Sequence, residues 1–394
     1  MKAAGVLFAI CMAILTGVGL VAIASVGDVQ SARIHGAGAR LFLLQLGFAG
    51  VGLVAAAAIA RTNPSFWFRR EVVLAAAALA VLGLLAVHLP GIGVANKGSA
   101  RWVRIGPVGV QPSEFAKIAS LLVVSWWVGD PALDKKSFVR SALAPAAWLG
   151  VLVLGLMAEP DLGSSFMLLA VDGLLLFVSG VRLRYLALFA CAAGIAFGLY
   201  VAHDPERLSR ITSVFGGAKT ERTAERADDA FQLETGLAAL AAGGATGVGL
   251  GNSLYKHYLP ESHTDFILAM VGEEAGLAAT LPCLLVFFAM ALAGFRIAMG
   301  VPDPRQRLFA LGLALHLCLS GAVNAGVVTG ALPTKGLALP FVSYGGSNLV
   351  ASLVAGGFLL GLAWRNKPRT GRLEDEPAPP PPPRGTPLSV GWGI

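Results

Sequence analysis

Charge and cysteine are both scarce in this sequence. Asp, Glu, Lys and Arg make up 13% of its 394 residues, about half of the share in a typical soluble domain. The four cysteines lie inside apolar runs, and their spacing suits neither a zinc site nor a disulfide framework. They are Cys11, Cys191, Cys283 and Cys318. These shortages argue against a soluble two-domain enzyme, which the length alone would favour, and against a small disulfide-stabilised fold.

Apolar residues, in contrast, account for 56% of the chain, and the mean hydropathy is +0.71. Several apolar runs reach about 20 residues, enough to cross the hydrocarbon core of a bilayer. The pattern predicts an all-α polytopic membrane protein with about ten transmembrane helices. The first run follows Lys2 without a clear small-residue cleavage site, so we expect a retained helix rather than a signal peptide. The predicted spans are 3–25, 41–60, 72–89, 114–128, 141–158, 164–181, 186–202, 265–293, 307–331 and 345–364.

Lys and Arg are concentrated in alternate loops, and this bias predicts the orientation of the chain. The segments 61–70, 135–140 and 296–307 and the region after 364 are rich in them, whereas the short loops between these segments carry fewer. We therefore expect a multi-pass protein of the cytoplasmic membrane with both termini in the cytoplasm. The net charge of +7 is then mostly a signal of topology, and no basic stripe on a soluble domain indicates nucleic-acid binding.

Two segments differ from the apolar spans. Residues 203–264 have mixed charge and are expected to form a large extracytoplasmic loop between helices 7 and 8. Residues 366–394 include an unbroken proline run at 379–383 and are expected to be a disordered cytoplasmic tail. The expected organisation is a membrane domain over residues 1–365 followed by this tail.

An ionisable residue in or at the edge of the membrane is costly, so it needs a partner or a function. The first group on the predicted outer side contains Arg101, Trp102 and Arg104. It continues into a helix where Glu114 and Lys117 lie one turn apart on one face. Glu114 also suits the positive end of the helix dipole, and Trp102 suits an interfacial anchor, so structural explanations stay open for both. Lys117, about one turn inside an apolar helix, is harder to explain in that way.

Two further groups of carboxylates lie on the same side. Glu159 and Asp161 form a turn between spans, where they either cap the next helix or, for Asp161, pair with Lys117 across the bundle. Asp265 lies where the chain re-enters the membrane, and capping of that helix is the alternative to a chemical role.

The remaining two features lie deeper. Glu273 and Glu274 follow Asp265 by two turns and must face a polar interior, because burying an unpaired carboxylate costs several kcal/mol. Residues 324–347, NAGVVTGALPTKGLALPFVSYGGS, contain prolines and glycines that interrupt any helix. Irregular backbone at membrane depth is tolerated where it lines protein or a wet cavity, so this segment is predicted to form a re-entrant loop around a site.

These residues lie in four segments, 96–117, 159–163, 259–274 and 324–347. In this order the segments resemble the SEDS family (shape, elongation, division and sporulation), which includes FtsW and RodA. The similarity covers nearly the whole chain to about residue 364. It rests on WVRIG with QPSEFAK, EPDLG, GVGLGNS with LPESHTDFI and GEE, and LPTKGLALPFVSYGGS. The PTKG sequence at 333–336 is more similar to the division branch, FtsW, than to the elongation branch, RodA.

The resemblance implies a peptidoglycan glycosyltransferase that polymerises lipid II on the outer face of the cytoplasmic membrane, for septal wall synthesis in cell division. Lipid II is a disaccharide-pentapeptide on undecaprenyl pyrophosphate. A class B penicillin-binding protein transpeptidase and other division proteins are the implied partners. Asp265 is the implied catalytic residue. The implied substrate-binding residues are Trp102, Arg101, Arg104, Glu114, Lys117, Asp161, His263, Lys335 and Ser343.

These residue types suit glycosyl transfer. A carboxylate at the edge of a low-dielectric region is suited to accept a proton from the attacking hydroxyl. Lys and Arg complement the diphosphate leaving group, with a divalent cation (Mg²⁺ or Mn²⁺) as an open addition whose ligands are not assigned. A lipid II flippase is the alternative, but it would need polar lining along both halves of its path, whereas the groups here cluster on one side. A scaffold that only recruits the transpeptidase leaves Asp265, Glu273 and Glu274 unexplained.

Overall fold

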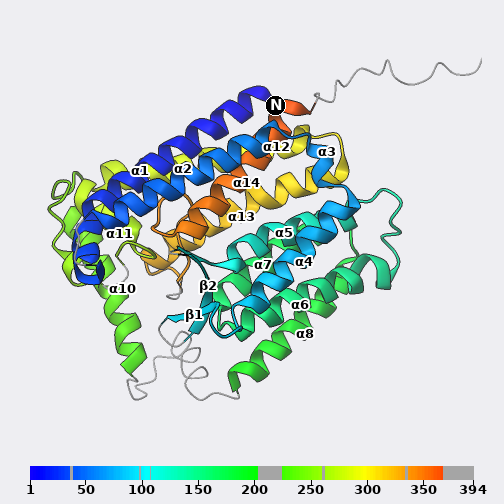
Figure 1. The fold of residues 1–394 in the computed structure, drawn as a ribbon, viewed down its shortest axis with the longest axis horizontal. Coiled ribbons are helices and arrows are strands. Elements are labelled where there is room, and N and C mark those ends of the chain that lie inside the picture. The colour runs from blue at the N-terminus through cyan, green and yellow to red at the C-terminus, as the bar shows by residue number, and fades with distance from the viewer. Residues whose placement is uncertain are drawn as a thin grey trace, which may run out of the picture.

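The computed structural model describes residues 1–35, 39–96, 99–106, 108–202, 224–259, 262–332 and 336–366, and these form a helical bundle with one small sheet (Figure 1). The α-helices are α1 (Lys2–His35), α2 (Arg40–Arg61), α3 (Pro64–Trp67), α4 (Arg70–Ala86), α5 (Pro112–Val128), α6 (Ala144–Ala158), α7 (Leu162–Val178), α8 (Leu183–Ala202), α10 (Ala224–Gly243), α11 (Ile267–Ala275), α12 (Leu277–Gly300), α13 (Pro304–Val328) and α14 (Gly346–Arg365). A π-helical turn, Val139–Leu143, leads into α6, and a 3₁₀ turn covers Tyr255–His257.

Each predicted span coincides with a helix or helix pair of the bundle, although the ends differ. Six of the described segments are long and apolar enough to cross a membrane, and α7 and the first part of α8 are shorter apolar helices. The six are Lys2–Gly27, Arg40–Arg61, Val139–Ala158, Leu277–Gly300, Pro304–Val328 and Gly346–Arg365. The predicted span 265–293 is interrupted, because Gly276 has a φ of +67° and separates α11 from α12.

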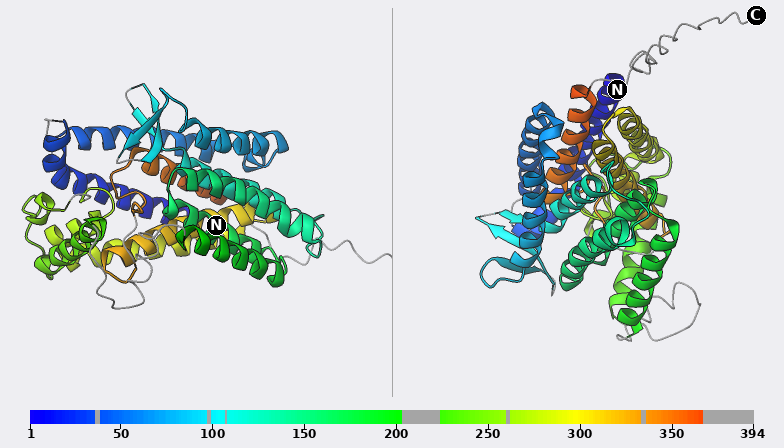
Figure 2. Two further views of the ribbon diagram at one scale, coloured as in Figure 1. Left: turned by 90° about the horizontal axis from the view of Figure 1, so that it is seen from below. Right: turned by 90° about the vertical axis from the view of Figure 1, so that its right-hand side faces the viewer.

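The helices run along the long axis of the molecule (Figure 2), and small residues let some of them approach closely. Helices α2 and α14 pack side by side. A Cβ at Gly357 of α14 would lie 2.6 Å from the Cα of Ala56 on α2, so only glycine permits this approach. The two helices are therefore in close backbone contact at this level.

One feature of the fold was not predicted. Strands β1 (Gly93–Asn96), β2 (Ser99–Ile105) and β3 (Val108–Val110) form an antiparallel sheet in the order β1-β2-β3 between α4 and α5. β2 carries an arginine on each face, Arg101 on one and Arg104 on the other, and Gly106 (φ +62°) allows the turn to β3. The all-α prediction therefore holds for the bundle and misses this short sheet.

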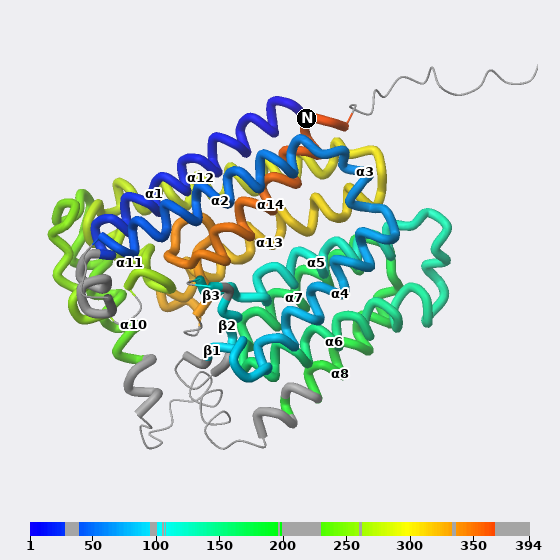
Figure 3. The backbone as a smooth tube through the Cα atoms, in the orientation of Figure 1, coloured from blue at the N-terminus to red at the C-terminus, as the bar shows by residue number. Residues whose placement is uncertain are grey.

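The predicted extracytoplasmic loop is partly helical. Its described part contains α10, which packs against α11 at the end of the bundle that also carries the sheet (Figure 3). Residues 203–223 and 260–261 of this loop lie outside the described residues. The predicted disordered tail lies outside them as well, except Asn366.

Candidate functional site

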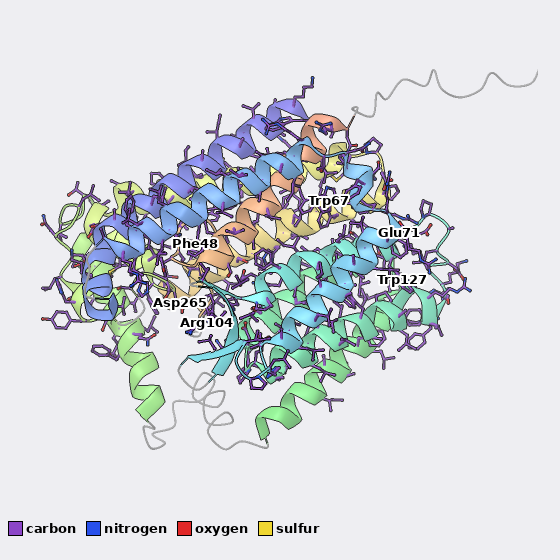
Figure 4. All side chains as sticks on the ribbon, in the orientation of Figure 1. Phe48, Trp67, Glu71, Arg104, Trp127 and Asp265 are labelled. Carbon is purple, nitrogen blue, oxygen red and sulfur yellow. The ribbon has the colours of Figure 1, made fainter. Side chains whose placement is uncertain are left out.

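Two ends of the bundle must be distinguished. Figure 4 shows Arg104 and Asp265 toward one end, and Trp67, Glu71 and Trp127 toward the other. We call the first the site end. We call the second, where the N-terminus lies beside the end of α14 (Figure 1), the terminal end.

At the site end, the segment 336–345 is bound to the turn that precedes α11. The Ser343 hydroxyl donates to the carbonyl oxygen of Thr264 at 2.6 Å, and the Tyr344 amide donates to the carbonyl oxygen of His263 at 2.8 Å. Gln45 of α2 holds the same segment, because its Nε2 donates to the carbonyl oxygen of Ser343 at 3.0 Å. The irregular backbone predicted to be re-entrant is thus satisfied by side chains and by a second turn.

Asn324 of α13 joins these two pieces. Its Nδ2 donates to the carbonyl oxygens of Asp265, at 2.8 Å, and Leu337, at 2.7 Å. The carboxylate of Asp265 lies over Gly336, where an added Cβ would come within 2.7 Å of its Oδ2. The N-cap residue of α11 is Phe266, whose side chain makes no capping hydrogen bond.

Glu114 and Lys117 form the ion pair expected between them. Their Oε1 and Nζ atoms are 2.9 Å apart, and the two residues are only 8% and 5% exposed. Asn348 of α14 donates to the other oxygen of Glu114 at 3.1 Å. The alternative pair of Lys117 with Asp161 does not form, because Asp161 accepts from the Ser164 amide at 3.0 Å and caps α7.

Arg101 binds the turn between α6 and α7. Its guanidinium donates to the carbonyl oxygens of Glu159, at 2.9 Å, and Pro160, at 2.7 Å. Successive strand residues face opposite sides, so Trp102 and Arg104 face away from this turn. Trp102 is half-buried, and the Arg104 side chain is exposed and makes no ion pair with a described residue.

Glu159 itself is fully buried, and neither of its carboxylate oxygens has a partner among the residues that the structure describes. Burial raises the pKa of Glu159 to about 8. Repulsion from Asp161 adds to this shift, and the Arg101 charge opposes it. This carboxyl group is therefore largely protonated at neutral pH.

Helices α5 and α14 connect the ion pair, the 336–345 segment and the turn that contains Asp265. The amide of Gln111, which precedes α5, donates to the Ser347 hydroxyl at the start of α14, at 2.8 Å. The α5 ion pair, the 336–345 segment and the Asp265 turn thus surround one end of α14. Lys335, which was predicted to bind substrate, lies outside the described residues.

A family model described as "Cell cycle protein", for FtsW, RodA and SpoVE, matches residues 6–367. The chain belongs to this family. A probable peptidoglycan glycosyltransferase FtsW of Trichlorobacter lovleyi is 38% identical over 352 residues, which cover 89% of this chain and 90% of the relative. Stage V sporulation protein E of Bacillus subtilis is 34% identical over 81% of this chain and 86% of the relative.

Solved structures show the same fold. A chain from a peptidoglycan synthase complex matches with a TM-score of 0.73 and 24% identity, over 90% of this chain and 96% of that one. The rod shape determining protein RodA of Thermus thermophilus matches with a TM-score of 0.65 and 24% identity, over 90% and 95%. The prediction of a polytopic helical membrane protein with the SEDS fold is confirmed.

Glu273 and Glu274 have a structural explanation within this family fold. The carboxylate of Glu273 accepts from the amides of Leu254, at 2.7 Å, and Tyr255, at 3.2 Å. Glu274 accepts from the Ser25 hydroxyl at 2.6 Å. The expectation of polar surroundings is correct. Glu273 holds the loop before the Asp265 turn directly, and Glu274 holds it through Ser25, whose hydroxyl oxygen accepts from the Gly251 amide at 2.9 Å.

Four polar residues of the site region were missed from sequence. Gln45, Asn324 and Asn348 make the contacts described above, and each is a side-chain amide within a largely apolar helix. Asp172 of α7 is 1% exposed and accepts from the Ser120 hydroxyl of α5 at 2.8 Å. A polar residue inside an apolar span is a signal that could have identified all four.

A metal site is not preformed in the part of the chain that the structure describes. No group of three or more His, Cys, Asp or Glu side chains is placed to hold an ion there. Glu114, Asp161, Glu273 and Glu274 instead bind Lys117, backbone amides or hydroxyls, and Glu159 stands apart from them without a described partner. Among the described residues, these carboxylates therefore do not form a metal site by themselves.

Proposed function

We propose that this peptidoglycan glycosyltransferase polymerises lipid II on the outer face of the cytoplasmic membrane, with Asp265 as the general base. One observation carries the assignment of the base. The Asp265 carboxylate lies over Gly336, where α13, the turn before α11 and the 336–345 segment meet. The relatives named as probable peptidoglycan glycosyltransferases support the reaction type.

In the proposed reaction, Asp265 removes the proton from the 4-hydroxyl of the acceptor sugar. The resulting oxygen attacks the anomeric carbon of the donor, and the bond from that carbon to the diphosphate breaks. Undecaprenyl pyrophosphate leaves with the bonding electron pair. General-base catalysis of this kind contributes about 10²–10⁴ in rate.

The negative charge of the diphosphate needs a cation. Arg104 is exposed on the sheet face opposite the Arg101 contacts, which suits it to bind phosphate oxygens. Lys335 is proposed to share this role. Trp102, on the same face as Arg104, offers an aromatic surface to a sugar ring.

The other residues proposed for substrate binding act mainly by position. Lys117 and Glu114 neutralise each other at the wall formed by α5 and α14. Asp161 caps α7 and so orders the turn that Arg101 binds. His263 and Ser343 bind the two turns to each other beside Asp265.

A divalent cation, Mg²⁺ or Mn²⁺, enters the proposal as an ion that accompanies the substrate. Mg²⁺ is commonly held by one or two carboxylates together with substrate phosphates, so it needs no preformed cluster. No step of the proposed reaction depends on it.

The proposed setting is the division septum, with both termini in the cytoplasm and the site end outside. The distribution of Lys and Arg supports this orientation. A class B penicillin-binding protein and other division proteins are the proposed partners. The similarity to a chain of a peptidoglycan synthase complex, which coordinates polymerization with crosslinking, supports a transpeptidase partner.

The packing of α5, α7 and α13 disfavours the flippase alternative. From the site end, polar side chains extend through Lys117 to Asp172 near the middle of the bundle. One turn further, a Cβ at Gly312 of α13 would lie 2.9 Å from Leu175 and 3.0 Å from Leu121. We call these three residues the apolar seal. A path for a charged headgroup would have to open this close contact.

The test is polymerisation of lipid II by the purified full chain, alone and with its transpeptidase, followed as glycan ladders on gels. Asp265→Asn keeps the shape and removes the base, so we expect at least a 100-fold loss with normal membrane insertion. Asp134→Asn, in a loop at the terminal end, is the matched control and is expected to polymerise normally. Polymerisation by Asp265→Asn at the wild-type rate would refute the proposed base.

A further inference from the structure

A hollow of about 450 Å³ lies at the terminal end of the bundle, far from the site end. It is lined by the last turn of α2 and the last two residues of α14, namely Ala57, Ala60, Arg61, Trp364 and Arg365. Along the rest of their length these helices pack closely, as at Gly357 against Ala56. The helices stay in contact beside the hollow, because a Cβ at Gly361 would lie 3.2 Å from the Cα of Ala60. The hollow therefore lies alongside the ends of this tight helix pair.

Its lining combines two cations with an aromatic ring. Arg61 and Arg365 are both exposed, and neither forms an ion pair with a described residue. The Nε of Arg365 donates to the carbonyl oxygen of Ala60 at 3.3 Å, which leaves the other guanidinium donors available. Trp364 is 44% exposed, and its indole lies against Gly5 of α1, where a Cβ would be 2.8 Å from Nε1.

Helix ends favour basic residues, so the dipole and the topology signal explain why arginines are present. They do not explain an open space between two arginines. That space is kept by Ala57 and Ala60, whose side chains are too small to fill it, and Ala57 is exposed on the outer surface of α2. The hollow is thus open both to solvent at the helix ends and to the membrane side.

We propose that this hollow binds the phosphodiester headgroup of an anionic phospholipid. Guanidinium groups bind phosphate oxygens in a two-pronged geometry, and basic pockets between transmembrane helices on the cytoplasmic side are suited to anionic lipids. Trp364 would lie at the headgroup level, and the acyl chains would leave past Ala57. Placement in the cytoplasmic leaflet rests on the orientation proposed above, whereas the preference for an anionic lipid does not.

The consequence for the enzyme follows from the two helices involved. Helix α2 carries Gln45, which holds the 336–345 segment, and α14 begins directly after that segment. A lipid that joins their far ends would resist splaying of the pair that supports the Asp265 turn. Phospholipid occupancy is therefore expected to stabilise the full chain.

The test counts lipids retained on the purified full chain by native mass spectrometry, after exchange into phosphatidylglycerol and phosphatidylcholine. Wild type should retain phosphatidylglycerol in preference to phosphatidylcholine. Each of Arg61→Gln and Arg365→Gln should weaken this retention about fivefold, and the double variant about 30-fold. Arg296→Gln, an exposed arginine of α12 outside the hollow, is the matched control.

A second variant tests the space rather than the charge. Ala57→Leu should narrow the hollow beside the two intact arginines and reduce retention at least tenfold, whereas Ala58→Leu on the neighbouring exposed position should not. Equal retention by wild type and the double arginine variant would overturn the proposal, as would an equal loss in Arg296→Gln.

Two further measurements distinguish a lipid site from a site for free phosphate, and failure of this proposal from failure of the proposed function. Displacement of the lipid by millimolar inorganic phosphate would show a site for the free anion and overturn the lipid assignment. The assay needs no turnover, so a chain that retains phosphatidylglycerol but makes no glycan would count against the proposed function alone.

Discussion

The charged groups at the two ends of this bundle are held in different ways. At the terminal end, Asp130 and Arg305 bind each other at 2.6 Å. At the site end, Arg101 and Glu273 instead bind backbone carbonyls and amides of turns. Arginines bind backbone carbonyls at both ends, as Arg307 and Arg365 do at the terminal end. The terminal end adds an ion pair between helix ends, and the site end adds a carboxylate that accepts from turn amides. The difference is that a buried carboxylate at the site end holds irregular backbone in place.

The largest stability effect is expected where this pattern has an exception, the buried pair at the site end. Glu114→Ala or Lys117→Ala leaves an unpaired buried charge, so each should cost about 3–5 kcal/mol. The double change should cost less than the sum, because it removes both charges together. Thermal unfolding of the three variants in detergent measures the cycle. Strictly additive costs would contradict the pairing.

A smaller effect is expected from Gly336→Ala, which tests whether backbone shape controls the site. The new Cβ would lie 2.7 Å from the Asp265 Oδ2 and must displace this carboxylate. A shift of about 1 Å can cost about 100-fold in rate, so polymerisation should fall by that factor while stability changes little. Gly50→Ala, on α2 with open space around it, is the control for substitution in the bundle. A fully active Gly336→Ala enzyme would show that the carboxylate position is not critical.

Glu159, also at the site end, allows a test of how stability depends on pH. Its pKa is raised to about 8 by burial, so the folded state keeps a proton that the unfolded chain loses above about pH 4.3. Stability should therefore decrease as pH rises from about 5 to about 8, by up to about 1.4 kcal/mol per pH unit. Glu159→Gln should remove this decrease, as measured by unfolding at several pH values. The exposed Glu71→Gln should retain it.

The ion pair at the terminal end should matter little. The pKa of Asp130 is lowered, first by the Ala132 amide and then by Arg305. Its contribution is therefore present at neutral pH and is lost in acid, as the pH falls through the lowered pKa. Since both side chains are partly exposed, Arg305→Gln should cost at most about 1 kcal/mol. Lipid II polymerisation should be unchanged, and a large loss would mean that this end also controls the site.

No effect on chemistry is expected from the tail. A chain that ends near Lys367 should still polymerise lipid II after reconstitution, because the tail is proposed to lie on the side opposite the site. Loss of activity with normal insertion would imply that the tail reaches the site or that the orientation is inverted. An impermeant thiol reagent and a cysteine placed in the tail of intact cells distinguish these cases, since only the inverted chain would be labelled.

Most of the bundle could be predicted because span length and apolarity depend on local sequence alone. The break at Gly276 could not, because it depends on a distant turn. The amides of Leu277 and Ala278 donate to the carbonyl oxygens of Gly244 and Ala245, at 3.0 Å each. Such backbone pairing between remote segments leaves no periodic signal.

In the site, too, contacts within one helix could be predicted from the sequence, and contacts between helices could not. The Glu114–Lys117 pair followed from helical spacing and was correct, whereas the suggested partner of Lys117 across the bundle was wrong. Asp161 forms the local cap that was the simpler explanation. Contacts between helices depend on how the helices rotate, and sequence spacing does not contain that information.

The apolar seal has an electrical consequence. A membrane voltage falls mainly across the part of a protein that water and ions do not enter, and Leu121, Leu175 and Gly312 lie between mid-bundle and the terminal end. A unit charge that crosses the whole field gains about 2.3 kcal/mol per 100 mV. The charges that Asp265 is proposed to move lie outside that layer. Glycan synthesis by this chain should therefore proceed at the same rate in energised and in depolarised membranes.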